Sequence, residues 1–200
     1  MDVNLSKAVE RSEWVDHQLS RLIQNLELIA TDRHRLAGGA FMVALDVHSA
    51  IAALTRRGNL PSAFMLSRSI WEAIVRGFWL LECASDEQIK KFIDDTSNQK
   101  TWNMIQDLEA KGSFGSDTLS SIHAHNSRRL NAMNHVGGPL LVRCNSERGV
   151  EFNFDSDEIG ECLGNACANA LLAALGLAQV AADEELGKAA FKVQTDAFAN

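Results

Sequence analysis

The feature that most constrains this chain is the recurrence of apolar residues every three or four positions over long stretches without proline. Only 2 prolines occur among 200 residues, so the residue that most disrupts helices is nearly absent. In residues 5–30, Val15, Leu19, Leu22 and Leu26 follow the 4-3-4 spacing of a single helical face. This periodicity predicts an all-α protein.

Capping residues and glycine stops divide the rest of the chain. Gly58 ends the second helix and Pro61 lies in the first turn of the third, so this pair is expected to pack antiparallel. The polar sequence DDTSNQK marks where we expect any interruption of the fourth helix. We expect helices over residues 32–57, 60–84, 86–111, 118–135 and 157–185.

Residues 139–155 show a different period. Apolar side chains alternate with polar ones on both sides of a short polar turn, which predicts a small β-hairpin before the last helix. An isolated hairpin is marginal, so we expect it to pack against the helices. The alternating residues are Leu140, Val142 and Cys144, then Val150, Phe152 and Phe154.

No repeat, low-complexity block or linker divides the chain, so we expect residues 1–200 to form a single helical-bundle domain. The expected architecture is an antiparallel bundle of five to six helices with the hairpin at 139–155. Residues 1–30 are its N-terminal helix, and residues 186–200 are expected to be a loosely held tail.

The formal net charge is −7 and the pI is about 5.3. This excludes binding of nucleic acid by bulk positive charge, and no DNA partner is expected, although a local basic patch would still bind phosphates.

The first residues lack an apolar signal segment, which predicts a cytoplasmic protein. The Ala/Leu-rich stretch 162–182 contains Asn165, Asn169 and Gln179, so we expect a buried helix there and no membrane span.

The first candidate constellation is Arg68, Glu72 and Arg76, which are spaced four residues apart and therefore share one helical face. The order Arg before Glu is the poorer one for helix stability. The alternatives are an ordinary solvated face, an ion pair that fixes helix register, or a pocket for a ligand or for catalysis.

The second constellation lies on the fifth helix. Ser121, His125, Arg128, Asn131 and His135 are spaced by 4, 3, 3 and 4 residues and so form one stripe. An arginine can stabilise charge on phosphoryl oxygens while a histidine moves a proton, which suits phosphodiester chemistry. The alternative is a polar outer face whose last turn is capped by His135.

No motif requires a metal or a cofactor, and we expect neither. His123 and His125 are two residues apart and point away from each other on a helix. Asp46 and His48 lie within an apolar helix, where hydrogen bonding in the core is the favoured role. The four cysteines include no C-x-x-C pair, so we expect reduced cysteines in the core.

The sequences SRSIWEAIVRGFWLL and LNAMNHVGGPLL, followed by the Ala-rich helix, resemble a group of uncharacterised bacterial helical proteins. That group in turn resembles HEPN domains, the helical bundles of toxin–antitoxin and phage-defence systems. The resemblance covers about residues 30–185. It implies a homodimer and a catalytic Arg followed by His, here Arg128 or Arg129 with His135, and Glu72 or Arg68 lining the site.

Three functions follow as hypotheses. The first is a HEPN-like, metal-independent endoribonuclease, or its inactive relative, with RNA or an antitoxin protein as partner. The second is a non-enzymatic bundle that acts by dimerisation or by binding a protein partner. The third is a sensor of a small anionic ligand that Arg68 and Arg76 hold. Besides these two arginines, Glu72, His125 and Asn131 are the candidate binding residues.

Overall fold

The computed structural model describes residues 3–134, 136–147 and 149–199, without the side chains of residues 3, 126–130, 132 and 134. This part of the chain forms nine helices in place of the expected five to six. They are α1 (Val3–Leu22), α2 (Asp32–Arg56), α3 (Leu60–Glu82), α4 (Asp86–Ile93), α5 (Thr101–Lys111), α6 (Thr118–Asn134), α7 (Gly138–Val142), α8 (Ser156–Ala181) and α9 (Glu184–Phe198).

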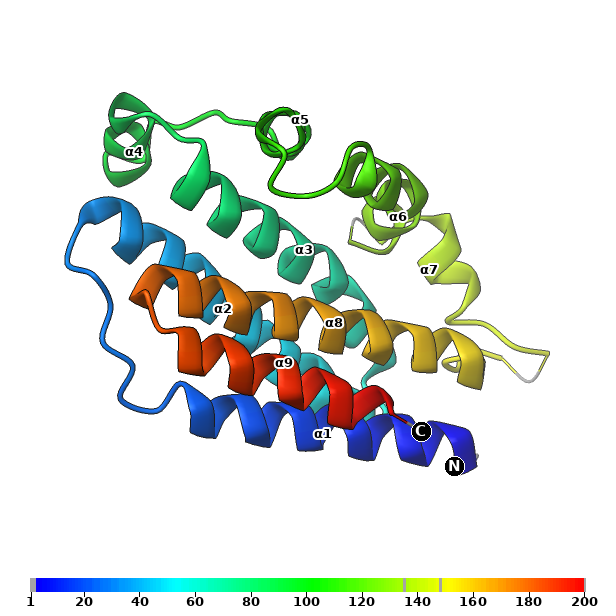
Figure 1. The fold of residues 1–200 in the computed structure, drawn as a ribbon. Coiled ribbons are helices and arrows are strands. Elements are labelled where there is room, and N and C mark those ends of the chain that lie inside the picture. The colour runs from blue at the N-terminus through cyan, green and yellow to red at the C-terminus, as the bar shows by residue number, and fades with distance from the viewer. Residues whose placement is uncertain (1–2, 135, 148, 200) are drawn as a thin grey trace.

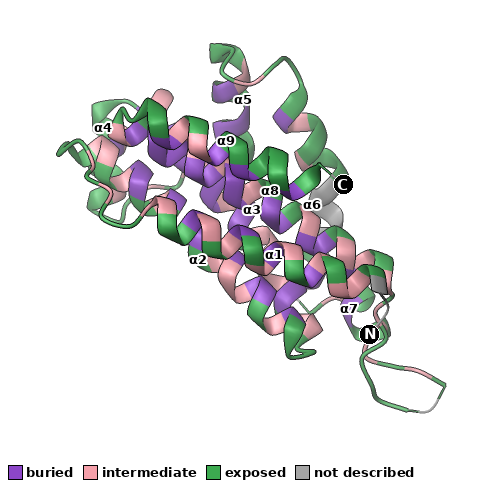
Figure 2. Cartoon of the chain, turned by 60° about the horizontal axis from the view of Figure 1, so that its bottom comes forward, coloured by how far each residue is buried: buried purple, intermediate pink, exposed green. Residues whose placement is uncertain are grey.

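The centre of the molecule is the packing of α2, α3 and α8 against one another. Helices α1 and α9 cover one side of α8, and α5 and α6 pack on the far side of α3 (Figure 1). Buried residues follow the inward faces of the helices and exposed residues the outward faces (Figure 2). Helix α3 therefore has neighbours on several sides, and both cavities described below border it.

Local sequence signals fix the starts of several helices. The Ser85 hydroxyl accepts from the Gln88 amide at 3.2 Å while the Gln88 side chain accepts from the Ser85 amide at 2.7 Å, a complete capping box for α4. Asp155 accepts from the Glu158 amide at 2.6 Å, as its sequence context predicts. Pro61 lies in the first turn of α3, which also confirms the prediction.

A close approach of three helices is centred on Phe41 of α2, whose side chain is fully buried. Gly77 of α3 and Gly176 of α8 both face this ring, and a Cβ added to either glycine would come within 3 Å of its carbons. Phe78 packs edge-on against Phe41 with ring centroids 4.9 Å apart. The two glycines thus make room for an aromatic ring between three backbones.

The predicted β-hairpin is wrong, because no strand occurs in the described residues of this region. Pro139 lies in the first turn of the short helix α7, and the only pairing that follows in these described residues is an isolated bridge between Ser146 and Gly149. Val142 is 70% exposed and Val150 87% exposed. Leu140 is buried and Phe154 packs against the core, so the alternating residues do not share one buried face. Without a second layer to cover it, a two-stranded ribbon gains too little from burial to form.

The predicted helices also differ at three places. Helix α1 ends at Leu22 and not near residue 30, and Asn25 adopts a left-handed backbone conformation with φ 65°. The region 86–111 is divided into α4 and α5, and the interruption lies in its polar middle, as expected. The predicted helix 157–185 ends at Ala181, after which Ala182 has φ 53°.

The expected loose tail at 186–200 is helical up to Phe198. Asp183 caps α9 by accepting from the Leu186 amide at 2.9 Å. The apolar stripe that the tail prediction overlooked packs α9 onto α8 and α1. Its buried members are Leu186, Ala190, Val193 and Ala197.

The Phe41 contact predicts the effect of a single added methyl group. Gly176→Ala places this methyl against a ring that cannot withdraw between α2, α3 and α8, so we expect a loss of about 1–3 kcal/mol in the free energy of unfolding. Urea unfolding followed by circular dichroism measures it.

Gly160→Ala is the matched control, because it makes the same change in the same helix where no atom lies within 4 Å. It should raise stability by about 0.5–1 kcal/mol, since alanine is the better helix former. Equal effects of the two substitutions would show that helix propensity, and not the contact with Phe41, governs both positions.

Candidate anion-binding site

The polar stripe that helical spacing predicts on α3 is present in the structure. Arg68, Glu72 and Arg76 are all half-buried on one face of the helix. The Arg68 Nε donates to Glu72 Oε1 at 2.8 Å, with about a third of each side chain exposed. A pair this exposed contributes little to stability by itself. Its consequence is to hold the Arg68 guanidinium in place beside α6.

Helix α6 meets this stripe through Asn131, whose side-chain oxygen accepts a hydrogen bond from Arg68 Nη1. These two residues are 63 positions apart in the sequence. They were predicted as members of two separate constellations. The structure brings them together at the contact between α3 and α6.

A cavity of about 350 Å³ opens beside this contact. Its walls come from α3, from α6, and from the segment that leads into α5. The lining residues are Arg68, Trp71, Glu72, Arg76, Gln99, Lys100, Thr101, His123 and Asn131. It therefore contains four of the five predicted binding residues, together with residues that the sequence reasoning did not assign to a pocket.

Arg76 has the most unusual environment in this cavity. Its Nε is buried without a hydrogen-bond partner in the described structure. The guanidinium carbon lies 5.9 Å from the centre of the Phe92 ring, at the distance of a weak cation–π contact. A buried donor without an acceptor is costly, and an anion in the cavity would supply the acceptor.

His123 contributes a neutral imidazole to the same cavity. The Trp71 Nε1 donates to His123 Nδ1 at 3.2 Å, so the neutral ring carries its proton on Nε2. Burial lowers the pKa of His123, the Arg68 guanidinium lowers it further, and Glu72 opposes the change. At neutral pH the ring therefore acts as a hydrogen-bond donor and not as a charge.

The charges that line the cavity favour an anion. Among the side chains that the structure describes, three cationic ones, those of Arg68, Arg76 and Lys100, line the cavity with one carboxylate, that of Glu72. Lys100 is the N-cap residue of α5 and has no side-chain cap hydrogen bond. The first amides of α5, beginning at Thr101, therefore add the positive end of a helix dipole to the cavity edge.

The other predicted site residues divide into two groups. His125 and Ser121 are exposed and do not line this cavity. Arg128 and Arg129 belong to α6, but their side chains lie outside the described structure, and so does the whole of His135. The predicted catalytic pairing of an arginine with His135 therefore stays a prediction.

Sequence reasoning missed Trp71, Lys100 and His123 as members of the site. Trp71 follows Arg68 by three residues, so helical spacing already placed it beside the stripe. His123 was weighed only as a metal ligand. Lys100 ends the polar DDTSNQK sequence, and no local signal connects that sequence with α3 or α6.

A second polar cluster surrounds His48, which is fully buried as predicted, whereas Asp46 is exposed. His48 Nε2 lies 3.1 Å from the Ser12 hydroxyl and 3.6 Å from the Cys167 thiol. Its Nδ1 has no hydrogen-bond partner in the described structure, and Asp16 Oδ1 lies 3.8 Å away. Burial lowers the pKa of His48 to about 4. The contact with Asp16 is therefore not an ion pair at neutral pH.

No three His, Cys, Asp or Glu side chains gather in a metal-binding arrangement within the described residues. None of the four cysteines, all within the described part of the chain, forms a disulfide bond; Cys162 and Cys167 are buried, and Cys83 and Cys144 are partly buried. Helices α2 and α8 are long and apolar enough to cross a membrane by length and composition. Half of the apolar window in α2 and 61% of that in α8 are buried inside the protein, as in core helices.

The fold and site together define a helical bundle with a basic cavity against its central helix. Residues 41–199 match a family described as a family of unknown function (DUF6988). Because this match spans most of the chain, the protein belongs to that family. The searches of curated proteins and of solved structures gave no significant match. The resemblance to HEPN domains, the homodimer and the cytoplasmic location stay predictions.

The His48 cluster predicts a specific dependence of stability on pH. The unfolded chain has the ordinary imidazole pKa near 6.5, and the folded pKa is about 4. Between these values the unfolded state binds more protons, so stability is complete above about 6.5 and falls as the pH drops toward 4. The loss reaches about 3 kcal/mol. Urea unfolding at pH 7 and at pH 4 measures it.

His48→Gln is the comparison variant, because it keeps a polar side chain in the core without an imidazole to titrate. The raised pKa of Asp16, caused mainly by burial, acts in the opposite direction in both proteins and cancels in their difference. If wild type and His48→Gln lose the same stability on acidification, His48 is not buried as an uncharged ring.

Proposed function

We propose that this protein binds a small phosphate-bearing ligand in the cavity between α3, α6 and the start of α5, and that it acts as a sensor of that ligand. The single observation that carries the proposal is the buried Arg76 Nε, which has no partner in the described structure and lies in a cavity where cations outnumber carboxylates. A phosphate group supplies several acceptor oxygens and negative charge at once.

Arg68 and Arg76 have different parts in this proposal. Arg68 already donates to Glu72 and Asn131, which fixes its guanidinium between α3 and α6. The Arg76 Nε–H has no acceptor in the described structure and can donate to the ligand. Lys100 and the first amides of α5 supply further positive potential. The neutral His123 adds an Nε2–H donor. This set of donors matches a tetrahedral oxyanion approached from several sides.

The net charge favours a small ligand over a nucleic-acid chain. The molecule carries −7 overall, so a long polyanion that extended beyond the cavity would meet a repulsive field. A ligand that ends within a cavity of about 350 Å³ meets mainly the local cations. Two or three phosphate-sized groups, or a phosphate with a small organic part, fit this volume.

Arg76→Gln should weaken binding of inorganic pyrophosphate by at least about tenfold, because a charge-assisted hydrogen bond is lost. Isothermal titration calorimetry at low ionic strength measures the affinity. Arg35→Gln is the matched control, since Arg35 is exposed on α2, does not line the cavity and removes the same overall charge. Its effect should stay below twofold.

Three outcomes would overturn this proposal. The first is that neither pyrophosphate nor AMP binds the wild-type protein at millimolar concentration. The second is that Arg35→Gln weakens binding as much as Arg76→Gln. The third is cleavage of single-stranded RNA that His135→Ala abolishes and Arg76→Gln leaves intact. That result would favour the ribonuclease hypothesis and assign the function to the predicted pair of an arginine with His135.

His123 predicts how anion binding depends on pH. Protonation adds a positive charge to the cavity, and because the pKa is lowered this occurs below the ordinary imidazole range. Sulfate is the suitable probe, because its charge is constant between pH 7 and 5. Its affinity should rise between pH 7 and 5, by up to about fivefold, which is the gain expected for one full added charge a few ångströms away.

The same titration with His123→Gln separates this histidine from the other groups. The variant keeps a polar side chain beside Trp71 but cannot gain a charge. The rise in sulfate affinity should disappear. A rise of unchanged size would assign the pH dependence elsewhere in the protein.

A further inference from the structure

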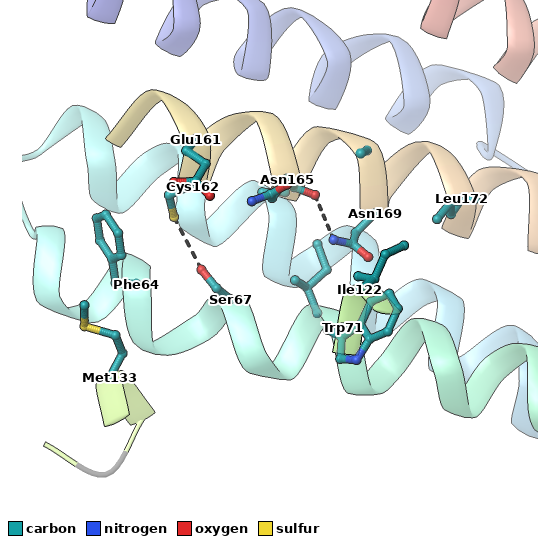
Figure 3. A pocket seen from close by; sticks show the side chains of 13 residues that line it. Phe64, Ser67, Trp71, Ile122, Met133, Glu161, Cys162, Asn165, Asn169 and Leu172 are labelled. Carbon is teal, nitrogen blue, oxygen red and sulfur yellow. Dashed lines mark hydrogen bonds between the residues drawn. The ribbon is translucent and has the colours of Figure 1, made fainter. Parts of the chain in front are cut away.

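Trp71 also borders a second cavity, of about 260 Å³, between α3, α6 and α8 (Figure 3). Among the residues that the structure describes, Trp71 is the only one that lines both this cavity and the anion site. The two cavities therefore meet at Trp71. The second one belongs to neither of the predicted constellations and has no part in anion binding.

Apolar side chains from three helices form most of its surface. Phe64 and Trp71 come from α3, Ile122 and Met133 from α6, and Leu172 from α8. Ile122 is 40% exposed, although Trp71 and Met133 beside it are almost fully buried. An apolar side chain left accessible at a concave surface gains free energy when an apolar ligand covers it.

The polar groups of this cavity lie mainly on one helix, α8. Asn165 and Asn169 are one turn apart and line the cavity together. The Asn169 Nδ2 donates to the backbone oxygen of Asn165 at 2.8 Å, which fixes the orientation of the amide. The Asn169 side-chain oxygen then faces the side of Ile122 and Trp71 (Figure 3). An apolar cavity with a fixed acceptor at one side is typical of small-molecule sites.

The volume sets the size of the occupant. A cavity of about 150 Å³ lined by aliphatic and aromatic side chains accommodates benzene, with six carbon atoms. By the same ratio, a cavity of about 260 Å³ accommodates roughly ten non-hydrogen atoms. A membrane lipid or a helix of another protein would be far too large to enter.

We propose that this cavity binds an uncharged, largely apolar small molecule of about ten non-hydrogen atoms, whose single hydrogen-bond donor reaches the Asn169 side-chain oxygen. The body of the ligand lies against Trp71, Ile122 and Met133. The site is distinct from the anion site, and its occupation does not require the function proposed above.

A series of primary alkanols from butanol to dodecanol tests this proposal by isothermal titration calorimetry on the full chain. Affinity should rise about fourfold with each methylene group, which is the gain expected for burying one such group. The rise should stop near nine or ten carbons, where the cavity is full. The methyl ethers of the same alcohols lack the donor and should bind about tenfold more weakly.

Ala166→Leu gives a readout that loss of stability alone would not produce. Ala166 lines the cavity from α8, and leucine adds three carbon atoms to it. The chain length at which affinity stops rising should fall by about three carbons. Ser67→Leu, at a half-buried lining position on α3, should shorten it by about two and serves if Ala166→Leu does not fold. Ala53→Leu, at an exposed position outside the cavity, should leave it unchanged.

Several results would overturn the inference. The first is that no alkanol binds saturably. The second is that affinity keeps rising with chain length without an upper limit. The third is that this limiting chain length is the same in wild type and in both lining variants. Arg76→Gln should leave the whole series unchanged. Normal alkanol binding without any pyrophosphate binding would reject the anion site and retain this one, and the reverse result would reject this one alone.

Discussion

The arrangement of this bundle depends on the contact between the Phe41 ring and the two glycines that face it. Gly77 and Gly176 let the backbones of α3 and α8 approach α2 closely enough to enclose a whole aromatic side chain. Tight packing of this kind tolerates little change in volume. Once α2, α3 and α8 are fixed relative to one another, one face of α3 is left for α5 and α6. The parts of this α3 face that α5 and α6 leave uncovered form walls of the two cavities.

Helix α3 then supplies two different chemical environments from adjacent positions. Arg68, Glu72 and Arg76 face the anion site, while Phe64 faces the apolar cavity, and Trp71 borders both. Two adjacent residues of α6 also line different cavities: His123 lines the anion site and Ile122 lines the apolar cavity. A change in the packing of α6 on α3 would therefore alter both cavities. The Trp71–His123 hydrogen bond joins these two helices at the point where the cavities meet.

Much of the helical architecture was predictable because its signals are local. Thr31, Ser85 and Asp155 each accept a hydrogen bond from an amide three residues ahead, as N-cap side chains do. The errors arose where a local pattern was ambiguous. Alternating apolar residues near 140–154 resembled strands, yet Val142, Val150 and Phe152 are exposed and no second layer covers them. The tail was judged by its position at the chain end, although its alanine-rich stripe completes a face of α8 and α1.

The sequence by itself determined that the chain is helical and that Arg68, Glu72 and Arg76 share one face, because the helical period relates residues one turn apart whatever surrounds them. It also showed that such a face would be polar within an otherwise apolar helix. Only the tertiary structure decided that Lys100, His123 and Asn131 meet this face, and that Arg76 carries a buried donor without an acceptor in the described structure. The physical reason is that contacts between helices depend on how whole side-chain surfaces fit together. No spacing along one segment encodes that fit.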